Sequence, residues 1–133
     1  LQLLGGLFAK FLGGGDKITI VGATSGDTGS AAIEAVAGRP GITIFMLHPE
    51  GRVSDVQRRQ MTTVAAPNVF NIALAGSFDD AQALVKALFN DQAFRAEQQL
   101  SAVNSINWAR LLAQIVYYVY AAVRLGAPHR EVA

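Results

Sequence analysis

Short apolar runs alternate with longer segments of helical spacing along this chain. Four runs, bounded by glycine, proline or polar residues, predict strands: 17–21, 42–47, 69–74 and 100–103. The longer segments predict helices at 30–37, 54–64 and 77–89, with a short one after Asp91. The run at 42–47 is apolar on both faces, as in a buried parallel sheet. The pattern predicts an α/β fold, a small parallel four-stranded sheet in a three-layer αβα, Rossmann-like arrangement.

The two ends of the chain predict further helices. Leucine and phenylalanine recur at helical spacing near the start, which indicates a buried or docking helix. The expected organisation is a single domain: the docking helix at 1–13, the sheet and crossover helices at 16–104, and a long helix at 105–126. The mean hydropathy is positive, which indicates a piece of a larger protein whose faces meet another part of it.

Composition narrows the classes of function. The net charge is +1 and the basic residues are scattered, which argues against nucleic-acid binding. The absence of cysteine excludes disulfides and thiolate chemistry and fits a cytoplasmic protein. The apolar opening segment is too short to span a bilayer and lacks signal-peptide features, so no membrane partner is expected. No constellation of residues suggests a metal site.

The polar loop after the first predicted strand is the first candidate site. In such sheets ligands bind outside the carboxyl ends of the strands, and a helix amino terminus presents unpaired N–H groups to an anion. Two glycines permit close backbone approach, and three hydroxyl groups add donors. The residues predicted to hold a carboxylate or phosphate are Thr24, Ser25, Gly26, Thr28 and Gly29.

A second interpretation of this loop is a helix cap without a ligand. Ser25, Asp27 or Thr28 could accept the first N–H groups of the helix. Asp27 is also unfavourable beside a bound anion unless its carboxylate faces a ligand hydroxyl or a protonated nitrogen. The loop lacks the Gly-Lys-Ser/Thr run of the phosphate-binding loops of nucleotide hydrolases.

A second polar cluster opens the long helix. Asn104 and Ser105 stand at its start, and Arg110 lies about one and a half turns inside, so its side chain can bend back toward an anion there. The alternative is a capped helix with Arg110 in a surface ion pair. His48 is a weaker candidate, either an acid–base group or a polar residue at a strand end.

Several segments carry a family resemblance. The sequence ATSGDTG at 23–29, followed by NSINWARLLAQ at 104–114, resembles threonine synthase, a pyridoxal-phosphate enzyme of the tryptophan-synthase-β fold type. LHPEGRVSDVQRRQM at 47–61 and FDDAQALVKALFND at 78–91 are similar to its intervening segments. The resemblance covers nearly the whole chain. It implies a lyase of threonine biosynthesis that converts O-phospho-L-homoserine and water to L-threonine and phosphate.

The resemblance also implies residue roles. In relatives of this fold type, the loop matching Thr24 to Gly29 grips the substrate α-carboxylate through N–H and hydroxyl groups. The position matching Asp27 is often Asn and faces the ring hydroxyl of the cofactor, and Asp is usual there in this kind of threonine synthase. Positions matching Asn104, Ser105 and Arg110 bind the substrate phosphate.

By the same resemblance, the catalytic residue lies elsewhere. The Schiff-base lysine is expected upstream of Leu1, and the loop that holds the cofactor phosphate is expected after the last helix. Residues 1–133 would then be the substrate-gripping domain of a larger enzyme, with no covalently bound pyridoxal phosphate of their own and the large domain as partner. The alternative from another class is a non-catalytic anion-binding or regulatory domain that kept the loop.

Overall fold

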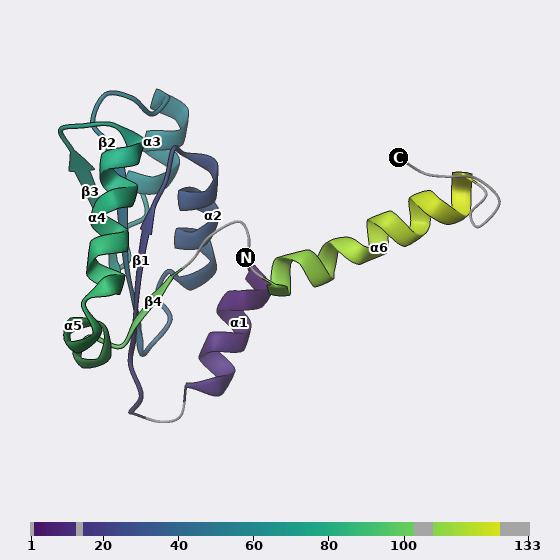
Figure 1. Cartoon of the computed structure of the whole chain (residues 1–133), viewed down its shortest axis with the longest axis horizontal. Coiled ribbons are helices and arrows are strands. Elements are labelled where there is room, and N and C mark those ends of the chain that lie inside the picture. Colours follow the sequence, from purple (N-terminus) through teal and green to yellow (C-terminus); the bar gives the residue numbers. More distant parts are fainter. Residues whose placement is uncertain (1, 13–14, 103–107, 126–133) are drawn as a thin grey trace.

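A computed structural model describes the backbone of residues 2–12, 15–102 and 108–125 (Figure 1). Within these residues strands and helices alternate. The strands are β1 (Ile18–Ala23), β2 (Ile42–Pro49), β3 (Val69–Leu74) and β4 (Leu100–Ala102). The helices are α1 (Gln2–Phe11), α2 (Asp27–Val36), α3 (Asp55–Thr62), α4 (Phe78–Asn90), α5 (Gln92–Glu97) and α6 (Trp108–Leu125).

The four strands form one parallel sheet in the order β3-β2-β1-β4, which confirms the predicted fold class. β1 lies between β2 and β4, with Ala23 opposite Leu47 on one side and Val21 opposite Ala102 on the other. The chain proceeds from β1 to β2 to β3 and then returns to the far side of β1. The boundary between β1 and β4 is therefore the topological switch point, where ligands bind in open α/β sheets.

Helices cover both faces of the sheet and give the three predicted layers (Figure 1). α2 and α3 pack on one face, and α1 packs on α2. The largest fully buried side chains belong to this side: Ile20, Ile33, Ile42, Ile44, Met46 and Met61. α4 packs on the opposite face. Burial of each such side chain contributes about 1.5–3 kcal/mol, so this core fixes the strand ends that carry the polar loops.

α2 begins earlier than the sequence pattern predicted. The predicted start was Ser30, but the helix already includes Asp27. Gly26 precedes it with a φ of 144°, a value that favours glycine, and this lets the chain turn from strand into helix within a few residues. The polar loop is therefore divided between a short turn at 24–26 and the first turn of α2.

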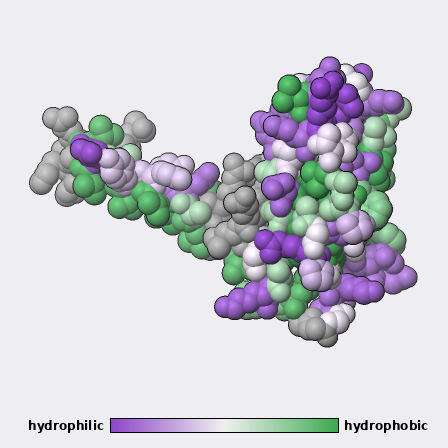
Figure 2. Space-filling view, turned by 180° about the vertical axis from the view of Figure 1, so that it is seen from behind, coloured by the Kyte–Doolittle hydropathy of each residue, from purple (hydrophilic) through white to green (hydrophobic). Residues whose placement is uncertain are grey.

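α6 extends away from the sheet instead of packing on it (Figure 1). Figure 2 shows apolar side chains along this projecting helix. Its most exposed large apolar residues are Val116, Tyr117, Tyr118, Val119, Tyr120, Val123 and Leu125. Apolar surface of this extent is typical of a contact with another protein surface. In the part of the chain that the structure describes, no helix has the length and apolarity needed to cross a membrane.

Candidate functional site

The candidate site lies where β1 ends, at the switch point of the sheet. Thr24 continues the ladder past β1, because its N–H donates to the carbonyl oxygen of Leu47 at 2.9 Å. The Thr24 side chain is 2% exposed, and its Oγ1 accepts the N–H groups of Gly26 at 3.0 Å and Gly29 at 2.9 Å. One buried hydroxyl therefore holds the turn from strand to helix. The N–H groups of Gly26 and Gly29 have this partner inside the protein.

Three neighbouring N–H groups have no acceptor among the described residues. They belong to Ser25, Asp27 and Thr28. α2 has no side-chain cap at Gly26, so the interpretation of this loop as a helix capped by one of those three side chains is wrong. The start of a ten-residue helix adds a partial positive charge at the same point. The arrangement can bind one anionic group against these donors.

Asp27 turns its carboxylate toward α3. Its Oδ1 accepts a hydrogen bond from Nε2 of Gln57 at 2.7 Å, and Oε1 of Gln57 accepts one from Oγ of Ser54 at 2.8 Å. Oδ2 of Asp27 has no partner in the described part of the chain and remains available to a ligand. Gln57 was not among the predicted site residues. Its only sequence signal is its place three residues after the helix cap Ser54, which indicates a local capping role.

The strands that precede the two predicted clusters are neighbours in the sheet. β4 ends at Ala102, opposite Val21 on β1, and so ends near the same edge as Thr24. Adjacent strands lie about 4.8 Å apart, so the carboxyl ends of β1 and β4 lie side by side. Asn104 and Ser105 lie outside the described residues. Arg110 belongs to the first turn of α6, and its side chain lies outside the described part.

His48 is a buried residue of β2, 4% exposed, near the carboxyl end of the strand. Its Nδ1 has no hydrogen-bond partner among the described residues, and no group of three His, Cys, Asp or Glu side chains gathers there or elsewhere in them. Proton transfer needs a donor or acceptor within hydrogen-bond reach. Among the described residues, no contact of Nδ1 supports an acid–base role for His48.

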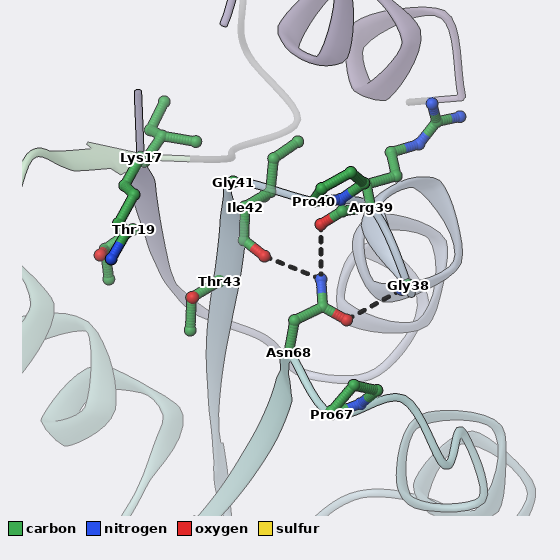
Figure 3. A pocket seen from close by; sticks show the side chains of 11 residues that line it. Lys17, Thr19, Gly38, Arg39, Pro40, Gly41, Ile42, Thr43, Pro67 and Asn68 are labelled. Atoms are coloured by element: carbon green, nitrogen blue, oxygen red, sulfur yellow. Dashed lines mark hydrogen bonds between the residues drawn. The ribbon is translucent and has the colours of Figure 1, made fainter. Parts of the chain in front are cut away.

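A pocket of about 430 Å³ lies at the opposite, amino-terminal edge of the sheet (Figure 3). At its centre Nδ2 of Asn68 donates to the carbonyl oxygens of Ile42 at 2.8 Å and Val36 at 3.0 Å, and Oδ1 accepts the Gly38 N–H at 2.8 Å. Lys17 and Arg39 line opposite sides of the pocket and do not converge (Figure 3). The Asn68 side chain thus stabilises the connection between α2 and β2. Its polar groups are used by the backbone, and the charged side chains of the pocket do not point toward a common ligand position.

Comparison with known proteins shows which family the chain resembles. No family model matches the chain. It is 59% identical over 134 aligned residues to threonine synthase from Pseudomonas aeruginosa, an alignment that covers all of this chain and 29% of the relative. It is 49% identical to threonine synthase from Saccharomyces cerevisiae over 90% of this chain and 25% of the relative. The chain is homologous to one segment of threonine synthases.

Solved structures of threonine synthases share the fold. The structure of pyridoxal-phosphate-bound threonine synthase from Brucella melitensis matches with a TM-score of 0.82 and 55% identity, over 98% of this chain and 28% of that one. Threonine synthase from Escherichia coli matches with a TM-score of 0.76 and 42% identity, over 95% of this chain and 30% of that one. This chain therefore spans less than a third of the length of the threonine synthases it matches.

Proposed function

We propose that this chain is the substrate-binding segment of a pyridoxal-phosphate-dependent threonine synthase. The whole enzyme would convert O-phospho-L-homoserine and water to L-threonine and phosphate in the cytoplasm. The similarity to threonine synthases over the whole chain supports this assignment. The observation that carries it is the array of unpaired N–H groups of Ser25, Asp27 and Thr28 at the switch point of the sheet.

The substrate α-carboxylate is the anion that this array is proposed to hold. The N–H groups point outward from the start of α2, and the hydroxyls of Ser25 and Thr28 stand beside them as further donors. Gly26 and Gly29 let the turn pack closely, because Gln57 fills the space that a Cβ at Gly26 would take, and Thr24 and Met61 fill the space at Gly29. Thr24 contributes indirectly, because its hydroxyl accepts the N–H groups of Gly26 and Gly29 and so fixes the turn that carries the donors.

Pyridoxal phosphate fits the donor set of the same edge. The free Oδ2 of Asp27 would accept a hydrogen bond from the ring hydroxyl of the cofactor, and Gln57 keeps Oδ1 occupied. When bound, this cofactor acts as an electron sink that stabilises carbanions of amino-acid substrates. The residues of this chain orient the substrate and cofactor for that chemistry. The lysine that binds the cofactor and the loop that holds its phosphate are assigned to the remainder of the enzyme.

The substrate phosphate is proposed to bind at the start of α6, to Asn104, Ser105 and Arg110. The pairing of β4 with β1 supports this placement, since both strands end near the same edge of the sheet. A carboxylate and a phosphate of one small substrate can then be held at once. The exposed apolar surface of α6 is assigned to contact with the large domain of the same enzyme.

The direct test is to purify the protein that contains this chain and measure threonine and phosphate formed from O-phospho-L-homoserine with pyridoxal phosphate. Equal amounts of both products are expected. Thr28→Val should raise KM, whereas Thr62→Val on α3, whose hydroxyl donates to the Arg58 carbonyl oxygen, should leave KM unchanged. Uptake of phosphate or sulfate without any turnover would instead favour the regulatory, anion-binding domain.

A further inference from the structure

Gln57 forms a contact between the start of α3 and the start of α2. No sequence motif predicted this contact. Its Nε2 lies 2.7 Å from Oδ1 of Asp27, thirty positions earlier in the chain. Its backbone N–H and its Oε1 both bond to Oγ of Ser54, at 3.3 Å and 2.8 Å. The orientation of the amide follows from its neighbours, because an ionised carboxylate can only accept and a hydroxyl can donate.

The Gln57 side chain does not complete a capping box at the start of its own helix and instead bridges the Ser54 hydroxyl and Asp27. A Ser followed three residues later by Gln can form a capping box, in which the Gln side chain returns to the N–H of the cap residue. α4 completes such a box between Ser77 and Asp80. In α3 the Ser54 hydroxyl accepts the Gln57 N–H, but the Gln57 amide reaches across to Asp27. Gly26 makes room, since a Cβ there would lie 2.6 Å from Oε1 and 2.7 Å from Nε2.

The contact gives the Asp27 carboxylate a donor other than the N–H groups of the loop. Asp27 is the first residue of α2, so its carboxylate lies beside the unpaired N–H groups at the helix start, where negative charge is favoured. A free carboxylate there would compete with a bound anion for the same donors. The amide of Gln57 offers Oδ1 a different donor and leaves Oδ2 as an acceptor.

We propose that Gln57 is a positioning residue. It holds the Asp27 carboxylate off the anion-binding N–H groups and in the orientation in which Oδ2 meets the ring hydroxyl of pyridoxal phosphate. This inference rests on the proposed function, because it assumes that the anion is the substrate carboxylate.

The test uses the full-length enzyme with Gln57→Met, which keeps the length of the side chain and removes its hydrogen bonds. A hydrogen bond of this kind changes an equilibrium about two- to tenfold. The KM for O-phospho-L-homoserine and the dissociation constant of the apoenzyme for pyridoxal phosphate should each rise by such a factor. Gln60→Met, at an exposed position on the same helix, should change neither value.

A double-substitution cycle decides whether Gln57 acts through Asp27. In an Asp27→Asn background, Gln57→Met should change the cofactor dissociation constant by less than about twofold, since no carboxylate remains to be held. If Gln57→Met raises the cofactor dissociation constant equally in both backgrounds, or does not raise it in the wild-type background, the inference is wrong. If the unsubstituted protein takes up no pyridoxal phosphate and makes no threonine, it is the proposed function that fails, and this inference falls with it.

Discussion

Thr24 and Gly29 are joined across the junction of β1 and α2 by a hydrogen bond of 2.9 Å from the Gly29 N–H to Oγ1 of Thr24. The same oxygen accepts the Gly26 N–H at 3.0 Å, and the Thr24 side chain is buried. A hydroxyl before the helix therefore performs the task of a helix cap, although the cap position itself is occupied by glycine. The N–H groups of Asp27 and Thr28 at the helix start stay open to a ligand as a result.

Thr24→Val should destabilise the protein and weaken substrate binding. Valine has nearly the same shape but no acceptor, so two buried N–H groups would lose their partner, at a cost of about 1–3 kcal/mol for each buried unsatisfied group. Chemical denaturation of the protein containing this chain measures the change. Thr28→Val, a few residues away, removes a hydroxyl that has no hydrogen bond in the described structure and should alter stability by less than about 0.5 kcal/mol. Equal losses of stability in the two variants would contradict the role given to Thr24.

Alanine should have opposite effects at two helical glycines. A Cβ at Gly29 would lie 2.5 Å from Cγ2 of Thr24 and 2.8 Å from Sδ of Met61, so Gly29→Ala should destabilise by about 1–3 kcal/mol through overpacking. A Cβ at Gly6 in α1 meets no atom within 4 Å. Gly6→Ala should stabilise by about 0.4–1 kcal/mol, because alanine restricts the unfolded chain. A stable Gly29→Ala variant would show that the turn can move away from Thr24 and Met61.

Much of the fold could be predicted from local pattern. β3 was found over Val69–Leu74 as expected, since a continuous β-rich run stands between Pro67 and Gly76. Ser54 caps α3 as predicted, because a serine before a helical segment is a local signal. The start of α2 was misplaced at Ser30, since Thr24 replaces the usual cap from five positions before Gly29, which no local capping rule describes.

Only part of the candidate site could be predicted from the sequence. The polar residues at 24–29 are contiguous, so their clustering could be recognised from the loop alone. The partner of Asp27 could not, because Gln57 comes from another helix and is brought near by the packing of α3 against α2. The pairing of β4 with β1 likewise could not be predicted from either segment, because it is a property of strand order.

The capping box at the start of α4 should make stability depend on pH. The N–H and hydroxyl of Ser77, each 2.7 Å from Oδ2, hold the pKa of Asp80 below its ordinary value, with a smaller contribution from the charge of Arg52. A carboxyl group whose pKa is lower in the folded state stabilises it above the unfolded value, and this stabilisation is lost as the pH falls through the folded value. Asp80→Ala should therefore lower the unfolding temperature at pH 7, and the difference should shrink below about pH 4.

Asp79→Ala is the matched control for this cap, because Asp79 neighbours Asp80 in the same first turn and its side chain makes no hydrogen bond in the described structure. At neutral pH, Asp79→Ala should lower the unfolding temperature less than Asp80→Ala does. A difference between wild type and Asp80→Ala that stays constant from pH 7 to about pH 3 would show that the cap does not depend on the charge of Asp80.

Arg110→Ala should reduce kcat/KM for O-phospho-L-homoserine in the full enzyme with little change in stability. A charge-assisted contact to the substrate phosphate is worth about 1.5–3 kcal/mol, which corresponds to roughly a ten- to more than hundredfold loss. Arg124→Ala removes a cation from the other end of α6, where Nε donates to the Tyr120 hydroxyl at 2.9 Å, and should leave kcat/KM unchanged. If kcat/KM is unaltered in Arg110→Ala, the alternative interpretation of Arg110 as a surface ion-pair residue is favoured.

The three lysines of this chain all lie away from the carboxyl edge of the sheet that carries Thr24. Lys10 is in the last turn of α1, and Lys86 lies in the body of α4. Lys17 precedes β1 and lines the pocket at the opposite edge. β1 has six residues, so it separates Lys17 from the candidate site by about 20 Å at the usual rise of a strand.

A lysine that binds pyridoxal phosphate must reach the ligand edge, so none of these three should react with it specifically. Borohydride reduction of the full-length enzyme with its cofactor, followed by mapping of labelled lysines by mass spectrometry, tests this. One stoichiometric label is expected, in a peptide outside the 133 residues, and the three lysines of this chain should carry only the scattered label of surface amines. Stoichiometric labelling at Lys10, Lys17 or Lys86 would contradict both the placement of the site at the carboxyl edge and the assignment of the catalytic lysine to the rest of the enzyme.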